Sequence, residues 1–412
     1  MQKILNVNAR QILDSRGNPT IEVEVISDKG CGRAMVPSGA STGAHEAVEL
    51  RDNGKSFHGL GVQKAVKNVN VIIKKNIVGK TLTQGELDHI LIKLDGTKNK
   101  KNLGANAILG VSVAACKALV GKTSEPLAEY IAELAHTTQK MPMPFMNVIN
   151  GGKHAGREFD VQEHMWVPIK TKNFNDALQA SVESYQTLRL LLKKKCGARA
   201  TLVGDEGGFS PDLDTAEQRL SLMEKALDEN GVKNKFAFAL DCAASEFYNK
   251  KTKKYQLGKK KYDTLSLIEY YKDLIRKFDV ISIEDPFDQE DWKSFSMFTK
   301  KMNGKVQVIG DDLLCTNRER IEKAIKEKAC NTLLLKMNQI GTLTETIEAA
   351  KLTLKHDWKV MVSHRSGETE DSFIADLAVG LGTGQCKFGA PCRSERTAKY
   401  NQLLRLAEHF EK

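Results

Sequence analysis

The sequence lacks any segment suited to crossing a membrane, since its 412 positions contain no run of about 18 apolar residues. The first residues enter an alternating strand pattern, so no signal peptide is expected. No CxxC pair occurs, and eight single cysteines favour buried free thiols in a reducing cytosol over disulfides. Together these absences predict a cytoplasmic protein, with a secondary surface or secreted pool left open.

A recognised nucleic-acid motif is also missing, although the chain carries a net charge of +10. Lysines cluster at 193–195 and between 250 and 261, without the interleaved aromatic residues of a nucleic-acid groove. Solvated loops are the simplest interpretation. Binding of nucleic acid or of host proteins has no support beyond the charge, which would also help to recruit a phosphorylated substrate.

Charged side chains do occur where buried strands are expected to end. The apolar, β-branched run 280–283 stops at Glu284, Asp285 and a proline. Paired acids at the end of a buried strand need a metal, a cation or water. The same pattern recurs five times: Asp241 follows 236–240, Asp311 and Asp312 follow 306–310, Lys336 follows 331–335, His364 and Arg365 follow 359–363, and Lys387 adjoins Cys386.

The spacing of these strand ends is regular. From Glu284 onward they recur every 23 to 28 residues. A (βα)8 barrel uses about 30 residues for each strand–helix unit, and its reactive side chains lie at the carboxyl ends of the strands. The segments 317–326 and 343–354 have helical spacing of apolar residues, as such units require. A catalytic barrel is therefore predicted.

A smaller domain is expected before the barrel. Residues 3–36 have the pattern of three strands, and apolar spacing predicts helices near 62–73, 85–94 and 105–120. We expect an α+β domain over 1–133 and the barrel over 134–412. The remaining expectations are lid loops at 37–43 and 150–157, a helix beginning near 123, a first barrel strand at 145–149, an antiparallel strand at 161–168 and a helix at 174–194.

Three of the strand-end acids form a candidate metal site. Asp241, Glu284 and Asp311 suit Mg²⁺, which prefers a few carboxylate oxygens and leaves room for substrate. The alternative is that each acid caps a helix N-terminus, which explains one acid better than three in register.

Lys336 is the candidate general base. It ends an apolar strand beside the acids, and burial with a nearby cation such as Lys387 or the metal is expected to lower its pKa. A Schiff-base lysine is the alternative, but it would not need three metal carboxylates. Glu206, in a glycine-flanked turn, is a candidate acid that Glu163 could support. His154, His364 and Arg365 offer donors for an anionic substrate.

The chain resembles the enolase family over nearly its whole length. The resemblance is carried by long, contiguous segments: DSRGNP (14–19), SGASTG (38–43), LGANAILG (103–110), GDEGG (204–208), LDCAASE (240–246), SIEDPF (282–287), LLLKMNQIG (333–341) and VSHRSGETED (362–371).

The resemblance implies a barrel that opens ββαα after the small domain, and the reversible, Mg²⁺-dependent dehydration of 2-phosphoglycerate to phosphoenolpyruvate. It implies that Lys336 removes the proton next to the substrate carboxylate and that Glu206 protonates the leaving hydroxyl, with Glu163 nearby. Asp241, Glu284 and Asp311 would hold one Mg²⁺, and a second would arrive with substrate at Ser41. The remaining implied contacts are Arg365 and Ser366 to the phosphate, Lys387 to the carboxylate, His154 from the second lid, and Gln162 and His364 beside the substrate.

Some alternatives stay open. Another member of the same superfamily, such as an acid-sugar dehydratase, would use similar strand ends, but the two lids with Lys387, Arg365 and Ser366 favour a phosphorylated substrate. A binding role, as a surface receptor or an RNA-turnover partner, would be an addition to catalysis. The resemblance further implies a homodimer or larger homo-oligomer. Residues 156–159 and His164 differ from the usual family pattern.

Overall fold

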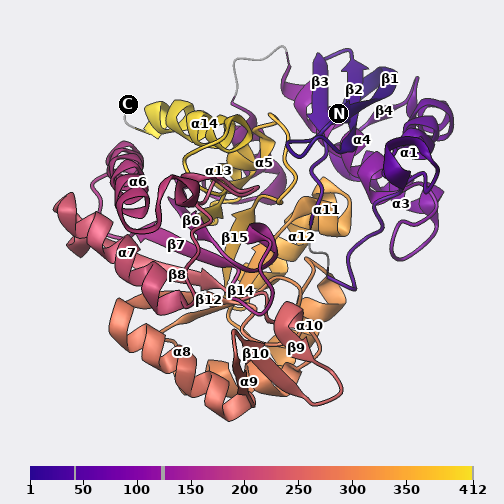
Figure 1. Ribbon diagram of the computed structural model, residues 1–412. Helices are drawn as coiled ribbons and strands as arrows, with labels where there is room; N and C mark the ends of the chain where they lie inside the picture. Colours follow the sequence, from indigo (N-terminus) through magenta and orange to yellow (C-terminus); the bar gives the residue numbers. More distant parts are fainter. Residues whose placement is uncertain (41–42, 122–125, 411–412) are drawn as a thin grey trace.

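The computed structural model describes residues 1–40, 43–121 and 126–410 (Figure 1). The chain begins with an antiparallel sheet in the order β3-β2-β1-β4. Buried and exposed residues alternate along β1, as they do in a strand with one face on a core. Gly17, with φ +76°, makes the turn between the first two strands. The strands are β1 (Gln2–Leu13), β2 (Pro19–Ser27), β3 (Cys31–Met35) and β4 (Thr81–Leu82).

One helix, α4, forms the core of this small domain. It is buried nearly all round, as its apolar sequence predicts, and it lies against β2 and β3. Gly32 is required at the crossing, because a Cβ there would stand 2.0 Å from the carbonyl oxygen of Ala114. The helices are α1 (Gln63–Lys67), continued as a π-helix through 68–73 into α2 (Lys74–Ile77), then α3 (Gln84–Asp95), α4 (Ala105–Val120) and α5 (Leu127–Ala135).

The second sheet closes on itself as a barrel. Its strand order is β5-β16-β15-β14-β13-β12-β8-β7-β6, and only Phe145 separates β5 from β6. The first and last strands of that order are therefore one continuous stretch. Strand β7 pairs antiparallel with both β6 and β8, and the strands from β8 onward are parallel. This arrangement confirms the enolase-type barrel with an antiparallel opening.

The helices of the second half surround the barrel, and the small domain lies beside it, next to α11 and α12 (Figure 1). The barrel strands are β5 (Met143–Pro144), β6 (Met146–Asn150), β7 (Glu163–Pro168), β8 (Phe236–Asp241), β12 (Val280–Glu284), β13 (Gln307–Gly310), β14 (Thr332–Leu335), β15 (Lys359–Ser363) and β16 (Gln385–Lys387). The helices are α6 (Phe174–Cys196), α7 (Ala216–Glu229), α8 (Thr264–Phe278), α9 (Trp292–Met302), α10 (Arg318–Glu327), α11 (Met337–Ile340), α12 (Leu343–Leu354), α13 (Phe373–Gly380) and α14 (Ser394–Phe410).

The alternation of side chains along the strands aims several charged groups at the barrel axis. A compact interior cluster contains Met165, Ala239, Ile309 and Leu334. Each of these lies two positions from a charged residue at the mouth. Because residues i and i+2 of a strand share a face, the charged residues point to the same side of the strand as the interior residues, toward the barrel axis. The four mouth residues are Glu163, Asp241, Asp311 and Lys336.

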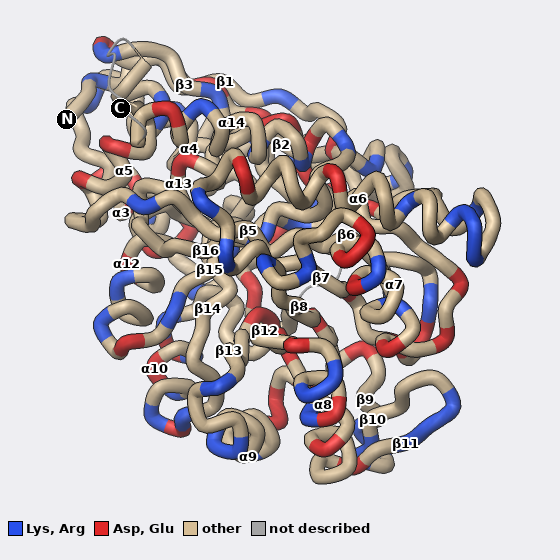
Figure 2. The backbone as a smooth tube through the Cα atoms, turned by 90° about the vertical axis from the view of Figure 1, so that its left-hand side faces the viewer, with Lys and Arg blue, Asp and Glu red and all other residues tan. Residues whose placement is uncertain are grey.

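One expectation about the fold was wrong. The lysine-rich segment 250–261, expected as a solvated loop, belongs to a three-stranded sheet of β9 (Tyr248–Asn249), β10 (Lys254–Leu257) and β11 (Lys260–Tyr262). Its lysines are exposed, and Figure 2 shows them on a hairpin at the edge of the molecule. Tyr255 of β10 anchors this sheet to the rest of the protein, because its fully buried ring packs on Phe247 and Phe287.

Other expectations stand or are refined. The strands expected at 145–149 and 161–168 and the helix at 174–194 are confirmed as β6, β7 and α6. A helix was expected to begin near residue 123, which lies in the segment 122–125 outside the described residues. Helix α5 begins at Leu127. Five of the eight cysteines are buried, whereas Cys31 is exposed. Within the described ranges, no helix has the length and apolar character needed to cross a bilayer.

Candidate active site

Three acids stand side by side at the barrel mouth. Asp241 is the Cα partner of Glu163 on one neighbouring strand and of Glu284 on the other. All three are almost completely buried. Burial, followed by repulsion from Asp241, raises the pKa of Glu284 well above its ordinary value. The cluster therefore has an excess of negative charge that a cation would relieve.

Lys387 lies among these acids. Its Nζ is 2.9 Å from Glu284 Oε2, 3.0 Å from Asp241 Oδ2 and 3.1 Å from Glu163 Oε2. Burial alone would lower the pKa of Lys387, but attraction to the three carboxylates outweighs it and keeps the lysine charged. The sequence had suggested Lys387 as a substrate contact and as a cation near Lys336, so its contacts with the expected metal ligands are new.

Asp311, the third expected metal ligand, is paired with Lys336. The Lys336 Nζ lies 2.5 Å from Asp311 Oδ2, and Gln339 donates to the other carboxylate oxygen at 2.9 Å. The structure does not show the expected fall in the pKa of Lys336. Burial does act to lower that pKa, but the attraction of Asp311 outweighs it and the net shift is upward.

The described residues offer a second acidic group, in which Asp285, Asp311 and Asp312 have carboxylate oxygens within 4.8 Å of one another. Asp285 is an unsuitable ligand, because its two oxygens accept the backbone amides of Asp311 and Asp312 at 3.0 and 2.7 Å. Its φ of +39° fits this role in fixing the turn. The set Asp241, Glu284 and Asp311 fits a hard divalent cation better, since ammonium groups are their main partners.

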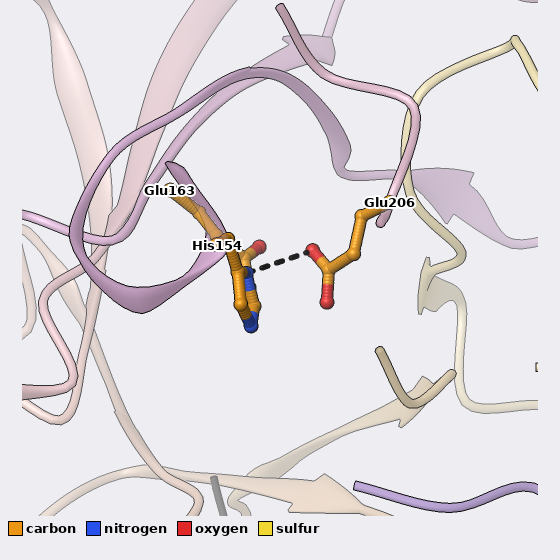
Figure 3. A group of neighbouring side chains, drawn as sticks. All are labelled: His154, Glu163 and Glu206. Carbon is orange, nitrogen blue, oxygen red and sulfur yellow. Dashed lines mark ion pairs between the residues drawn. The ribbon is translucent and has the colours of Figure 1, made fainter. Parts of the chain in front are cut away.

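A third group lies across the mouth from Lys336. His154 Nδ1 is 3.6 Å from Glu206 Oε2 and 3.7 Å from Glu163 Oε1. Figure 3 shows the Glu206 carboxylate pointing toward the His154 ring, with Glu163 behind it. Asn147 donates to Glu206 at 2.9 Å. The second glycine-rich loop, which carries His154, thus meets the 204–208 turn.

The two glutamates of this group have pKa values shifted in opposite directions. Burial and the nearby Glu206 raise the pKa of Glu163 well above its ordinary value. Burial also acts to raise the pKa of Glu206, but electrostatic interactions with His154, His364, Arg396 and Lys387 outweigh it and hold that pKa well below normal. Glu163 therefore holds a proton more readily than Glu206 does in this site.

His364 is held in place from outside the site. Its Nε2 lies 3.5 Å from Glu206 Oε1, and its Nδ1 lies 2.6 Å from Arg396 Nη1. Burial lowers the pKa of His364 well below its ordinary value, so the ring is neutral. Since the guanidinium can only donate, Nδ1 accepts and the proton of the ring is on Nε2, facing Glu206.

The expected phosphate contacts lie where β15 ends. The guanidinium of Arg365 binds Glu46 at 2.9 and 3.2 Å and Asn338 at 3.0 Å. The hydroxyl of Ser366 and the Oε1 atom of Gln162 are buried and have no hydrogen-bond partner among the described residues. Buried polar atoms without partners are consistent with contacts to a ligand. Ser41, the expected ligand of a second metal, lies outside the described residues.

Three site residues were not anticipated from the sequence. Glu46 pairs with Arg365, Asn147 with Glu206 and Arg396 with His364. Glu46 follows a predicted lid, and Asn147 lies within the first predicted barrel strand. These positions could have indicated both residues as candidates for the site. Arg396 is in a C-terminal helix that carries no chemical motif, so nothing local indicated it.

Comparisons with known proteins agree with this geometry. The model of the enolase N-terminal domain matches residues 4–131, and that of the enolase C-terminal TIM barrel domain matches residues 138–412. The chain belongs to the enolase family. Proteins named enolase from Thermococcus gammatolerans and Pyrococcus furiosus are 53% and 51% identical to it, over 99% of this chain and 95% of each relative. Enolase 1 of Entamoeba histolytica is 53% identical over 99% of this chain and 96% of its own length.

This enolase is accordingly a phosphopyruvate hydratase, a carbon–oxygen lyase that interconverts 2-phosphoglycerate and phosphoenolpyruvate. Membership of the family also implies a divalent metal cofactor, and the acidic clusters described above fit one.

Proposed function

We propose that Lys336 and the pair Glu206–Glu163 act on opposite sides of the substrate in this dehydration. Lys336 takes the C2 proton, and Glu206 delivers a proton to the C3 hydroxyl as water leaves. The observation that carries the assignment is the separation of the two groups. Lys336 pairs with Asp311, whereas Glu206 contacts His154 and His364.

The metal site supports this order of events. Asp241, Glu284 and Asp311 would hold a divalent cation, which we infer to be Mg²⁺ because all three ligands are carboxylates. When bound, it would supply positive charge beside the substrate carboxylate and so make the C2 proton more acidic. An Asp311 that shares its charge with a cation attracts the Lys336 ammonium less, which favours the neutral amine required of a base.

Substrate binding follows from the remaining groups. Arg365 and Ser366 would take the phosphate, in competition with Glu46, which pairs with Arg365. Lys387 would take the substrate carboxylate when a metal replaces it among the acids. His154 and Gln162 would approach from the second loop, His364 would donate from Nε2, and a second Mg²⁺ would enter with the phosphate at Ser41. A cytoplasmic homodimer or larger assembly is also proposed, to be tested by light scattering.

The proposed roles are tested by separating the two half-reactions. Formation of phosphoenolpyruvate from 2-phosphoglycerate is followed by absorbance, with and without Mg²⁺. Exchange of the C2 hydrogen is followed by NMR in deuterated water. Lys336→Ala should abolish both turnover and exchange. Glu206→Gln should lower turnover by about 100-fold or more but retain exchange, since proton removal precedes the step that needs the acid.

Two results would overturn the assignment. Normal C2 exchange in Lys336→Ala, together with lost exchange in Glu206→Gln, would reverse the two roles. Phosphoenolpyruvate formation that does not depend on a divalent cation would remove the metal site from the mechanism. Loss of exchange in the wild-type enzyme after chelation is the expected result.

A further inference from the structure

A buried ion pair lies beneath the loop that carries His154. Arg219, in the first turns of α7, is fully buried, and its two terminal nitrogens bind both carboxylate oxygens of Asp160 at 2.7 and 2.5 Å. One of these nitrogens also donates to the carbonyl of Leu213 at 2.6 Å. Asp160 is the only carboxylate paired with Arg219 in the described part of the chain. Burial of a guanidinium is costly unless such a partner is held in place.

The local structure of α7 gives no reason for an arginine at this position. The helix begins at Ala216, so Arg219 lies near the positive end of the helix dipole, where a cation is unfavourable. Neighbouring His164 offers no negative charge to Arg219, and burial followed by the charge of Arg219 holds its pKa well below normal. The favourable interactions of Arg219 are therefore with Asp160 of the loop and with the carbonyl of Leu213, which precedes the helix.

The pair lies where the two ends of the loop meet. The amide of Gly151 donates to the carbonyl of Gln162 at 2.8 Å and closes the loop at its base. A Cβ on Gly151 would stand 3.0 Å from an Asp160 oxygen and 3.1 Å from an Arg219 nitrogen, so the pair is packed directly against this crossing. His154 follows Gly151 by three residues and Glu163 follows Asp160 by three. A shift at the crossing would move both groups relative to Glu206.

We propose that Asp160 and Arg219 are positioning residues for the proton-delivering half of the reaction. Their bidentate ion pair fixes the base of the 151–162 loop on α7, and so sets His154 and Glu163 against Glu206. Lys336 follows β14 and has no hydrogen bond or ion pair with either residue among the described residues. The inference rests on the roles proposed above for Lys336 and for the Glu206–Glu163 pair, and it adds a residue pair that touches neither substrate nor metal.

The test compares turnover with C2 exchange in variants of the full-length enzyme. Asp160→Asn keeps the shape and the acceptor for the Val161 amide but removes the charge. It should lower kcat by about 10- to 100-fold, as expected for a misplaced catalytic group, and leave C2 exchange within about twofold of wild type. Arg219→Lys cannot supply the planar fork and should behave similarly. The double variant Asp160→Asn with Arg219→Met should be no worse than either single variant.

Asp212→Asn is the matched control. Asp212 also pairs with an arginine of this loop, Arg157, but its side chain is 93% exposed, so its removal should change neither rate. Equal losses of turnover and exchange in Asp160→Asn, or no loss in either, would overturn the inference. If the wild-type enzyme shows no Lys336-dependent exchange, the proposed function fails instead, and the two failures are thereby told apart. Thermal unfolding identifies any variant that does not fold. If Asp160→Asn does not fold, the comparison of turnover with C2 exchange is made with Arg219→Lys.

Discussion

At the scale of single residues, the acids of the barrel mouth differ in their hydrogen-bond and ion-pair partners. Asp285 accepts backbone amides, whereas Asp241 and Glu284 contact the ammonium of Lys387. Asp312 has its pKa raised to about 7, first by burial and then by the charge of Asp311. A cation therefore has two competing sets of carboxylates that share Asp311, and substitutions can distinguish them.

Glu284→Gln should weaken binding of Mg²⁺ by about tenfold or more and remove nearly all turnover, because a site with three carboxylates loses one charge. Asp312→Asn should leave the affinity for Mg²⁺ within about threefold of wild type. Titration calorimetry of both variants measures this directly. The opposite ranking would place the ion at the group formed by Asp285, Asp311 and Asp312.

At the scale of elements, most helices end and begin as their sequences indicate. Asn317 caps α10 by accepting the amide of Arg320, and Thr83 with Glu86 forms a capping box on α3. Helix α13 is different, because every one of its residues is buried and one of them is Asp376. Burial raises the pKa of Asp376 to about 6 despite a hydrogen bond from Gln402.

This shift makes the stability of the protein depend on pH. Between about pH 4 and pH 6 the folded state binds more protons than the unfolded state, so the contribution of Asp376 to stability falls as the pH rises. Asp376→Asn retains the acceptor for Gln402 and removes the charge. We expect stabilisation by up to about 3 kcal/mol above pH 7, shrinking toward pH 4.

Thermal unfolding of Asp376→Asn at several pH values provides the measurement. The substitution Asp273→Asn, at an exposed position of α8, should give no such pH-dependent gain. A gain in the melting temperature that is the same at pH 4.5 and pH 7.5 would show that ionisation of Asp376 is not its source.

At the scale of the whole molecule, ion pairs join the small domain to the barrel, and their side chains differ greatly in solvent exposure. Lys117 of α4 binds the buried Asp371 at 2.5 Å, and Asp371 also accepts the Met35 amide from the same domain at 3.1 Å. Lys98 and Glu319 form another such pair at 3.1 Å, but their side chains are 90% and 76% exposed. Only the first of these contacts should matter to stability.

Asp371→Asn should destabilise the protein by about 1.5–3 kcal/mol, the range for a hydrogen bond to a charged group, and should speed proteolysis between the domains. Glu319→Gln removes the exposed pair and should alter neither property. Urea unfolding and limited trypsin digestion of both variants test the difference. Equal behaviour of the two variants would mean that the Lys117–Asp371 pair does not join the domains energetically.

The sequence by itself determined the elements and the chemistry that each strand brings to the barrel mouth. Strand and helix signals are local, so β8, β12, β13, β14 and β15 could be found with their terminal charges, and Asp241, Glu284, Asp311, Lys336 and His364 with them. The division of the chain near residue 133 and the individual residue roles remain predictions. The three-stranded sheet of β9, β10 and β11 was missed because short strands with exposed lysines have the sequence pattern of a loop.

Only the tertiary structure decided which charges meet. Lys387 lies 146 residues from Asp241, Glu46 lies 319 from Arg365, and Asp160 lies 59 from Arg219. The register of neighbouring strands and the closure of the barrel bring these groups together, and no local pattern encodes either. The direction of the Lys336 pKa shift depends on the same fact. Burial alone lowers that pKa, and the Asp311 carboxylate, 25 residues away, reverses the shift because it lies 2.5 Å from the amine in the folded chain.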